Sequence, residues 1–416
     1  MQPSAAELNK LSDAEESNLL PVPSKHAKQQ EHLRFKAMSW NILAQCLIKR
    51  KNFPYITGKG TDNPLAIKTR SILIAQCLRL HSPHIVSLQE VCVDHWTHHL
   101  HALFTEAGFD SVYVKKDKEK KAGHGLAILW RRDRFEMVSH TEVQFDNHPI
   151  THPTTITPVT GNIAVIAALK YIPQSNEEPD DFGVVVSNHH LFWWPKAKYE
   201  KLRQIHVLLE EVKIFREMVA LQHGISWPYM MTGDFNTTPS DTLYHVMTSK
   251  SALSRDQLDS LAAVELTKPS KVPVSVEPVE SHAEADTVGK NGETRIKEMP
   301  PKEVMVEAIR LHGHFVSAYS QYRTSDQGHP DMSTTSQQWA GEPSYTCFDT
   351  WRGTLDYIMV LEELRQAARK LVPVQVLQIP RPQWLEPGLP NLRFPSDHVP
   401  IMAEVAVISS DQGSGE

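Results

Sequence analysis

Eight short runs rich in β-branched and aromatic residues recur along the chain, and they constrain its fold more than any other feature. Each run has the length of an ordinary β-strand. The predicted strands cover residues 35–43, 84–91, 125–130, 162–172, 181–191, 228–235, 354–360 and 399–407. This number of strands is enough for two β-sheets.

The segments between these runs have helical periodicity. It is clearest over residues 198–221, where apolar side chains recur every three or four positions. Further helices are predicted at 64–80, 94–107 and 240–247. Strands and helices that alternate in this way are typical of an α/β fold.

Charge excludes one simple mode of nucleic-acid binding. The 416 residues include 43 Lys and Arg against 49 Asp and Glu, for a formal net charge of −6. A domain that binds phosphates over a wide face is usually basic. Any nucleic-acid partner is therefore expected to be held locally.

Several features bear on the compartment. The longest uninterrupted apolar run, 163–169, is far shorter than the roughly 20 residues that span a bilayer, so no membrane span is expected. The first residues lack a basic segment followed by an apolar core, which argues against a targeting peptide. The cysteines are widely spaced and form no CxxC pair, which argues against a disulfide framework or a thiolate zinc site. We expect a cytoplasmic or nuclear protein, or one found in both.

Two stretches lack aromatic residues and are expected to be disordered, because they cannot bury enough surface to offset the entropy of ordering. The first is residues 1–34, predicted as a flexible N-terminal tail. The second is a Pro-, Val-, Glu- and Lys-rich insertion, predicted over 250–303. Residues 35–408 form a single predicted domain around this insertion, and 409–416 a C-terminal tail.

Polar side chains appear repeatedly where the apolar strands end. They are Asn41, Glu90, His190, Asp234, Asn236, Asp397 and His398, with Asp356 inside the run TLDYIMV. Strand ends of this kind are where α/β enzymes place their chemistry, so we expect one site.

Taken singly, most of these residues have an ordinary structural explanation. A lone Asp or Asn after a strand is usually a turn former or a helix cap, and with 22 histidines a single His is weak evidence. Asp356 is different, because a buried carboxylate without a partner costs several kcal/mol. A histidine is its natural partner.

Six motifs carry a family resemblance. In chain order they are SWNIL (39–43), SLQEV (87–91), NHHLFWWP (188–195), GDFNTTPSDTLY (233–244), GTLDYI (353–358) and PSDHVP (395–400). They resemble the successive motifs of the endonuclease/exonuclease/phosphatase superfamily. Within it the chain resembles the deadenylase and nocturnin branch, and most of all the Ngl-type RNA exonucleases.

This resemblance implies a four-layer α/β sandwich, in which two mixed β-sheets pack face to face and helices cover both outer faces. It makes 35–408 the catalytic domain and implies Mg²⁺-dependent cleavage of phosphate esters, with one or two ions and Mn²⁺ as an alternative. Glu90 is then the principal metal carboxylate, with Asn41 and Asp397 close to it. Mg²⁺ prefers hard oxygen ligands of this kind.

The resemblance also assigns catalytic roles. Asp234 and Asn236 are expected to position the attacking water, and Asp234 to accept its proton. His190 and His398 are expected to flank the scissile phosphate, where imidazolium groups stabilise developing charge. Asp356 is expected to orient His398.

Candidate substrate contacts lie around these motifs. Basic residues that follow HLFWW form either a phosphate track or an ordinary solvated helix face. The aromatic residues either stack on bases or pack beneath the site. The residues assigned to substrate binding are Asn188, Trp193, Lys196, Arg203, Phe348 and Trp351. Asn188 is also expected to brace the strand end beside His190.

The leading functional hypothesis is a 3′ to 5′ RNA exonuclease that acts on single-stranded 3′ ends and releases nucleoside 5′-monophosphates. A nocturnin-like phosphatase or phosphodiesterase acting on a small nucleotide is the main alternative, since one fold hosts all these activities. An inactive RNA-binding protein is disfavoured, because none of the six motifs has lost its acid or imidazole. Cys347 and Thr350 depart from the deadenylase spelling. The sequence therefore leaves open whether the enzyme prefers poly(A) or trims RNA 3′ ends in general. No leucine-rich repeat precedes the catalytic region, so docking into the large deadenylase assembly is not expected.

Overall fold

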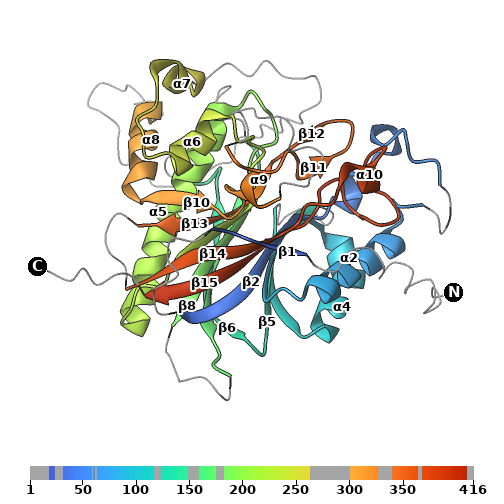
Figure 1. Ribbon diagram of the computed structural model, residues 1–416, viewed down its shortest axis with the longest axis horizontal. Coiled ribbons are helices and arrows are strands. Elements are labelled where there is room, and N and C mark those ends of the chain that lie inside the picture. The colour runs from blue at the N-terminus through green and yellow to red at the C-terminus, as the bar shows by residue number, and fades with distance from the viewer. Residues whose placement is uncertain are drawn as a thin grey trace, which may run out of the picture.

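Two β-sheets form the centre of the molecule in the computed structural model, which describes residues 18–23, 31–58, 60, 63–116, 123–148, 159–174, 182–262, 300–326, 340–363 and 368–409 (Figure 1). The larger sheet has the order β1-β14-β15-β2-β3-β5-β4 and the smaller one β10-β13-β9-β8-β7-β6. Strands β2 and β3 are parallel, as are β8 and β9, and the other pairs are antiparallel. Both sheets are therefore mixed, as expected.

The strand bounds are as follows. The larger sheet contains β1 (Leu19–Pro21), β2 (Glu31–Asn41), β3 (Ile85–Cys92), β4 (Phe109–Lys115), β5 (His124–Arg131), β14 (Arg369–Leu377) and β15 (Ile401–Ser409). The smaller sheet contains β6 (Phe135–Gln144), β7 (Ile163–Tyr171), β8 (Gly183–His190), β9 (Tyr229–Asp234), β10 (His314–Ser317) and β13 (Asp356–Glu362). A separate ribbon pairs β11 (Cys347–Phe348) with β12 (Arg352–Gly353).

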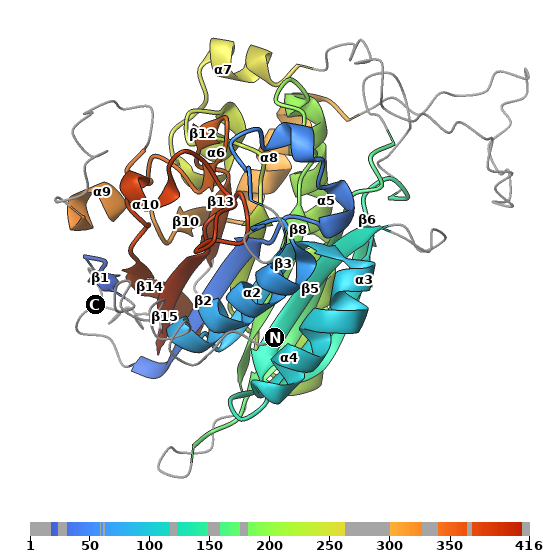
Figure 2. The same cartoon turned by 90° about the vertical axis from the view of Figure 1, so that its right-hand side faces the viewer.

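Helices cover the outer face of each sheet. Figure 2 shows α2 (Ile67–His81) and α4 (His101–Glu106) over the larger sheet, with the long helix α5 (Lys198–His223) on the far side. The predicted helix 94–107 consists of α3 (Val93–His95), a π-helical turn (Trp96–Leu100) and α4. The remaining helices are α6 (Thr242–Thr248), α7 (Arg255–Ser260), α8 (Lys302–Leu311), α9 (Tyr322–Ser325) and α10 (Pro382–Leu385), with 3₁₀ turns η1 (Gln45–Leu47) and η2 (Arg50–Asn52). The predicted four-layer α/β sandwich is confirmed.

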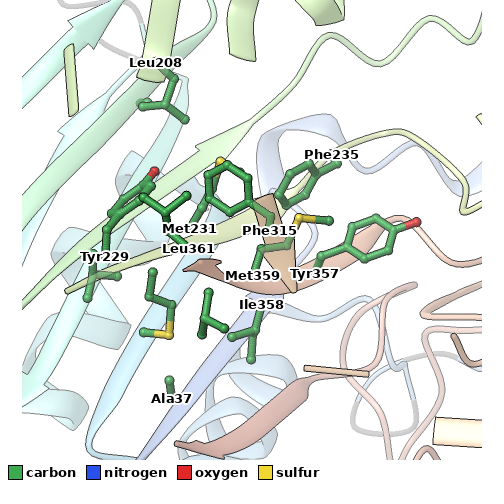
Figure 3. Close-up of a cluster of buried hydrophobic side chains, with 14 of the residues drawn as sticks. Ala37, Leu208, Tyr229, Met231, Phe235, Phe315, Tyr357, Ile358, Met359 and Leu361 are labelled. Carbon is green, nitrogen blue, oxygen red and sulfur yellow. The ribbon is translucent and has the colours of Figure 1, made fainter. Parts of the chain in front are cut away.

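The alternation of side chains explains this layering. In β2, Phe35 and Ala37 face the second sheet, whereas Met38 and Trp40 face the helices over the larger sheet. Strand β7 is apolar on both faces and buried throughout its centre, as a strand between a sheet and a helix layer must be. Figure 3 shows the same arrangement around β9 and β13, with Ala37 of the facing sheet on one side and Leu208 of α5 on the other.

Besides the two- and three-residue strands β1, β11 and β12, the sequence did not predict the four longer strands β4, β6, β10 and β14. Three of them are sheet edges, and β14 is covered on its outer side only by the three-residue β1. Such strands expose one face or one edge, so they contain charged and polar residues and, in β14, a proline. Their apolar signal is consequently weak.

The segment boundaries also need correction. Within the predicted tail 1–34, β1 pairs with β14 and β2 begins at Glu31, so these parts are ordered. Within the predicted insertion 250–303, α7 has a complete capping box and α8 begins at Lys302; residues 263–299 lie outside the described part of the chain. Strand β15 extends by one residue into the predicted C-terminal tail, and 410–416 are not described.

Among the described residues, no helix has the length and apolar character needed to cross a bilayer.

Candidate active site

The candidate site lies at one end of the two stacked sheets, where strand ends bring polar residues together. Asn41 is the last residue of β2, His190 the last of β8 and Asp234 the last of β9. Strand register places Asp234 opposite both His190 and Asp356. Asp356 is the first residue of β13, not an interior one as expected.

A hydrogen-bonded group of Asn41, Glu90 and Asp234 links the two sheets. The amide nitrogen of Asn41 donates to Glu90 Oε1 at 3.2 Å and to Asp234 Oδ2 at 3.0 Å. Its amide oxygen accepts the backbone N–H of Leu43 at 3.0 Å. In this structure Asn41 therefore spaces two carboxylates, and its role as a metal ligand stays a prediction.

The backbone turns sharply at Glu90. This residue lies in a bulge of the β3–β5 pairing and has a φ of 57°, in the left-handed region that residues other than Gly seldom adopt. The bulge turns the carboxylate toward the strand ends, where Oε2 accepts the backbone N–H of Ala44 at 2.9 Å. Strain of this kind is often found at functional sites.

The charge state of Glu90 follows from its neighbours. Burial alone would raise the pKa of this carboxyl, but the nearby imidazoles of His190 and His124 act against burial. Together with the hydrogen bonds from Ala44 and Asn41 they lower the pKa to about 2. Glu90 is therefore an anion at neutral pH.

Asp397 lies on the loop before β15. Ser396 Oγ donates to the backbone oxygen of Asn41 at 2.7 Å and lies 3.2 Å from Asp397 Oδ1, which ties this loop to β2. Burial raises the pKa of Asp397 to about 6, and the negative charge of Glu90 acts in the same direction. A cation bound between these two carboxylates would relieve this repulsion.

Asp356 and His398 form a buried pair. Nδ1 of His398 lies 2.7 Å from Asp356 Oδ2, and the same oxygen accepts the hydroxyl of Thr346 at 2.5 Å. Burial would lower the pKa of His398, but the carboxylate of Asp356 raises it well above its usual value. The imidazole is thus held in one orientation and favoured in its protonated form.

Asp234 is placed to accept a proton. Its Oδ1 accepts the backbone N–H of Asn236 at 2.9 Å, which fixes the carboxylate plane. Its Oδ2 lies 3.5 Å from His190 Nε2 and 3.9 Å from His398 Nε2. A substrate group at Oδ2 would therefore be flanked by both imidazoles.

The donors present suit a hard divalent cation. Carboxylate oxygens of Glu90, Asp397 and Asp234 and the amide of Asn41 are the ligand types that Mg²⁺ takes. Asp234, Asp356 and His398 also bring ligand atoms within 4.8 Å of one another, but Asp356 and His398 already bond to each other. The first set is therefore the better candidate, and the residues fit the cofactor that was expected.

Three of the predicted substrate-binding residues are buried and make their contacts inside the protein, so the structure offers no exposed surface for this role and it stays a prediction. Asn188 bridges the sheets, donating to the carbonyls of Leu88 and Ala127, each at 2.9 Å. Arg203 is 1% exposed and pairs with Glu200.

Phe348 is the third of these residues. It is fully buried, and the guanidinium of Arg352 covers its ring at 4.0 Å from the centroid. Its ring therefore cannot stack on a base.

The other three predicted contacts lie on the surface. Trp193 is 56% exposed and Trp351 48% exposed, and Lys196 is exposed as well. Trp193 stacks on Trp194, with ring centroids 6.4 Å apart. These side chains can reach a ligand without any rearrangement of the core.

Sequence reasoning missed several residues of the site. Thr346 and Ser396 support the Asp356 and Asp397 carboxylates, and both belong to the quoted or adjacent motif segments, so they could have been found there. His124, the first residue of β5, interacts electrostatically with Glu90, and nothing in its local sequence distinguishes it from the other histidines. Arg70 reaches the site from α2, far from every motif.

The fold and the site define a hydrolytic enzyme of the nuclease and phosphodiesterase class, in which acidic side chains and two imidazoles meet at the strand ends of a two-sheet sandwich. A model of the Endonuclease/Exonuclease/phosphatase family matches residues 38–398. The chain belongs to this family, whose enzymes generally depend on a divalent metal.

Sequence relatives within this family include two proteins of Saccharomyces cerevisiae. RNA exonuclease NGL2 is 28% identical over 354 residues, which cover 79% of this chain and 67% of that protein. Probable RNA exonuclease NGL3 is also 28% identical, over 368 residues that cover 84% of this chain and 69% of that one. The resemblance to Ngl-type RNA exonucleases is thereby confirmed.

Solved structures share the fold. The crystal structure of ANGEL2, a 2′,3′-cyclic phosphatase, has a TM-score of 0.62 at 22% identity and covers 94% of this chain and 98% of that one. The human Nocturnin catalytic domain has a TM-score of 0.53 at 18% identity, with coverages of 91% and 96%. At these identities the likeness concerns the fold.

Proposed function

We propose that this protein is a Mg²⁺-dependent 3′ to 5′ RNA exonuclease that releases nucleoside 5′-monophosphates and acts in the cytoplasm, the nucleus or both. The observation that carries the proposal is the position of Asp234 Oδ2, between His190 and His398 and hydrogen-bonded to the Asn41 amide that also contacts Glu90. RNA is the proposed substrate because the similar yeast proteins are named as RNA exonucleases.

Each residue has a separate task in hydrolysis. Glu90, Asp397 and Asn41 would hold the metal ion, which neutralises phosphate charge and helps to ionise the attacking water when it is bound. Asp234 accepts a proton from that water as it attacks phosphorus in line with the departing 3′ oxygen. The phosphorus to 3′ oxygen bond breaks, and the released nucleotide keeps the phosphate on its 5′ oxygen.

The imidazoles act on the charge that develops on the phosphate. His398, kept protonated by Asp356, donates from Nε2 to a nonbridging oxygen, and His190 donates from the other side. Trp193 and Trp351 supply exposed ring faces for the terminal bases, where stacking contributes roughly 1–3 kcal/mol per base. Lys196 supplies a positive charge near the strand end for a backbone phosphate.

The test is a comparison of substrates with the purified full chain. RNA labelled at its 5′ end, as poly(A) and as mixed sequence, is incubated with Mg²⁺ or with EDTA, beside matched DNA and a dinucleotide phosphate. We expect a ladder of labelled products shortened from the 3′ end, nucleoside 5′-monophosphates by chromatography, and no reaction in EDTA. The Asp234→Asn variant serves as the inactive control. Intact RNA together with release of inorganic phosphate from the small nucleotide would replace this proposal with a phosphatase.

A further inference from the structure

Arg70 of α2 is a buried guanidinium that has no ion-pair partner among the described residues. It is fully buried, and its hydrogen bonds go to neutral oxygens: the backbone carbonyls of Ile42, Leu43 and Pro395 and the side chain of Gln45. The Nε–Pro395 O distance is 2.7 Å, and the distance from Nη1 to the Gln45 amide oxygen is 2.6 Å. Burying a cation without an ion-pair partner costs free energy, so the hydrogen bonds of Arg70 must offset that cost in the folded protein.

The first group of contacts holds the turn that leaves β2. Leu43 has a φ of 56°, a left-handed conformation that is strained for leucine. Arg70 binds the carbonyls of Ile42 and Leu43, which fixes this turn. This turn directs the N–H of Ala44 to the Glu90 carboxylate and the N–H of Leu43 to the Asn41 amide oxygen.

The second contact holds the loop before β15. Arg70 binds the carbonyl of Pro395, the residue before Ser396. Ser396 joins this loop to Asn41 O and contacts the carboxylate of Asp397. One side chain on α2 therefore connects the two loops that position all the candidate metal ligands of the larger sheet.

The charge of Arg70 adds to this geometry. The carboxylates of Asp397 and Glu90 both act on Arg70 through space, and neither bonds to it. Because Arg70 does not bond to them, the carboxylate oxygens keep lone pairs available for a cation beside the hydrogen bonds from Asn41, Ala44 and Ser396. The nearby positive charge limits the repulsion between the carboxylates when no cation is bound.

We propose that Arg70 is a positioning residue that preforms the divalent-metal site by clamping the 42–45 and 395–397 loops around Glu90, Asn41 and Asp397. This inference rests on the proposed function, because it takes those three residues as the metal ligands. A lysine would keep the charge but could not reproduce a planar fork that reaches carbonyls on two loops.

The test measures metal binding apart from turnover. Mg²⁺ affinity is determined by calorimetry, and Mn²⁺ affinity by electron paramagnetic resonance, for the wild type and Arg70→Lys without RNA. We expect Arg70→Lys to weaken both affinities by about tenfold or more, as losses of groups that orient metal ligands do. In turnover assays the half-saturating Mg²⁺ concentration should rise by the same factor, and kcat should recover at high Mg²⁺.

Arg216→Lys is the matched control. Arg216 also sits on a helix and binds a carbonyl through two nitrogens, with Nε and Nη2 at 3.1 and 2.9 Å from Trp227 O, at the opposite end of β9 from Asp234. It should lower the melting temperature without changing metal affinity. Unchanged metal affinity in Arg70→Lys would overturn the proposal and leave Arg70 a residue of stability alone.

Three further outcomes are separable. If Arg70→Lys does not fold, Gln45→Leu removes one partner of the clamp, and weaker metal binding in that variant supports the proposal while unchanged binding overturns it. A wild type that binds Mg²⁺ but leaves RNA intact would refute the RNA substrate and not the role of Arg70. A wild type that binds neither cation would refute both.

Discussion

Asp356 Oδ2 lies 2.7 Å from Nδ1 of His398, and the opposite ring nitrogen of the same imidazole lies 3.9 Å from Asp234 Oδ2. One carboxylate thus orients a histidine toward another carboxylate that is placed to take a proton. The two acids face the same imidazole but have different tasks, because only Asp356 is bonded to it.

This relationship predicts the effect of Asp356→Asn. The change keeps the shape of the side chain but removes the charge that favours protonated His398, so turnover should fall about 100-fold or more. RNA affinity should change much less, since Trp193, Trp351 and Lys196 are untouched. Combining it with His398→Ala should cost little more than either change alone, and additive losses in kcat would show that the two residues act separately.

Replacement of Glu90 tests the metal site. Glu90→Gln keeps an oxygen for the N–H of Ala44 but removes the negative charge, so metal affinity and turnover should both fall, by about 100-fold for turnover. Calorimetry with Mg²⁺ and RNA cleavage assays measure the two effects, and thermal unfolding serves as the control. Wild-type turnover in excess chelator would contradict the metal mechanism.

Asp397 predicts a pH dependence of metal binding. Its pKa is raised to about 6, so below pH 6 a cation must displace a proton, and the apparent Kd should rise as pH falls from 7 to 5. Above pH 7 the dependence on this group should disappear. Titrations with Mg²⁺ at several pH values check this, and a Kd that is flat between pH 5 and 7 would be inconsistent with Asp397 as a ligand.

The raised pKa of Asp397 also affects the stability of the metal-free protein, and there the ionised form is unfavourable. Because the folded pKa lies above the unfolded value, ionised Asp397 destabilises the protein by a few kcal/mol at most. This destabilisation is absent below about pH 4, grows as pH rises to 6 and is constant above that. Asp397→Asn should therefore raise the melting temperature at pH 7 in EDTA and have little effect near pH 4.

Trp193 and Arg203 are predicted to behave oppositely. Trp193→Ala removes an exposed ring, so it should weaken RNA binding by roughly 1–3 kcal/mol and leave the melting temperature unchanged.

Arg203→Met leaves Glu200 as a buried unpaired charge, so it should destabilise the fold by about 3–5 kcal/mol. Fluorescence anisotropy with RNA and thermal unfolding measure both; weakened RNA binding by a well-folded Arg203→Met would support its predicted role in substrate binding.

Replacement of the buried His189 by an apolar residue is predicted to stabilise the fold. It is fully buried against the edge of Phe235, and neither ring nitrogen has a hydrogen-bond partner among the described residues. His189→Leu replaces it with an apolar side chain of similar volume and should stabilise the fold by about 1 kcal/mol or more, with turnover unchanged. A lower melting temperature in chemical or thermal unfolding would indicate that the imidazole has a partner in solution.

The central strands and the longest helix could be predicted from the sequence. All eight apolar runs are strands, and the helix predicted at 198–221 is α5, because periods of 2 and 3.6 are local properties. The polar residues at the ends of those strands meet at one end of the sandwich, since β2, β8 and β9 end there and their antiparallel neighbours β13 and β15 begin there. The edge strands β4 and β6 were not predicted because many of their side chains are exposed to solvent, which weakens the apolar pattern.

The chain itself thus determined the layers of the fold and the group of acids and imidazoles at the strand ends, because both follow from short-range patterns and motif spelling. Tertiary structure decided which polar residues are available to a ligand. Asn188 finds its acceptor on Leu88, 100 positions away, and Arg70 reaches Pro395 across 325 positions. Burial and hydrogen-bond partners at such separations depend on how whole sheets and helices pack, so no local pattern carries them.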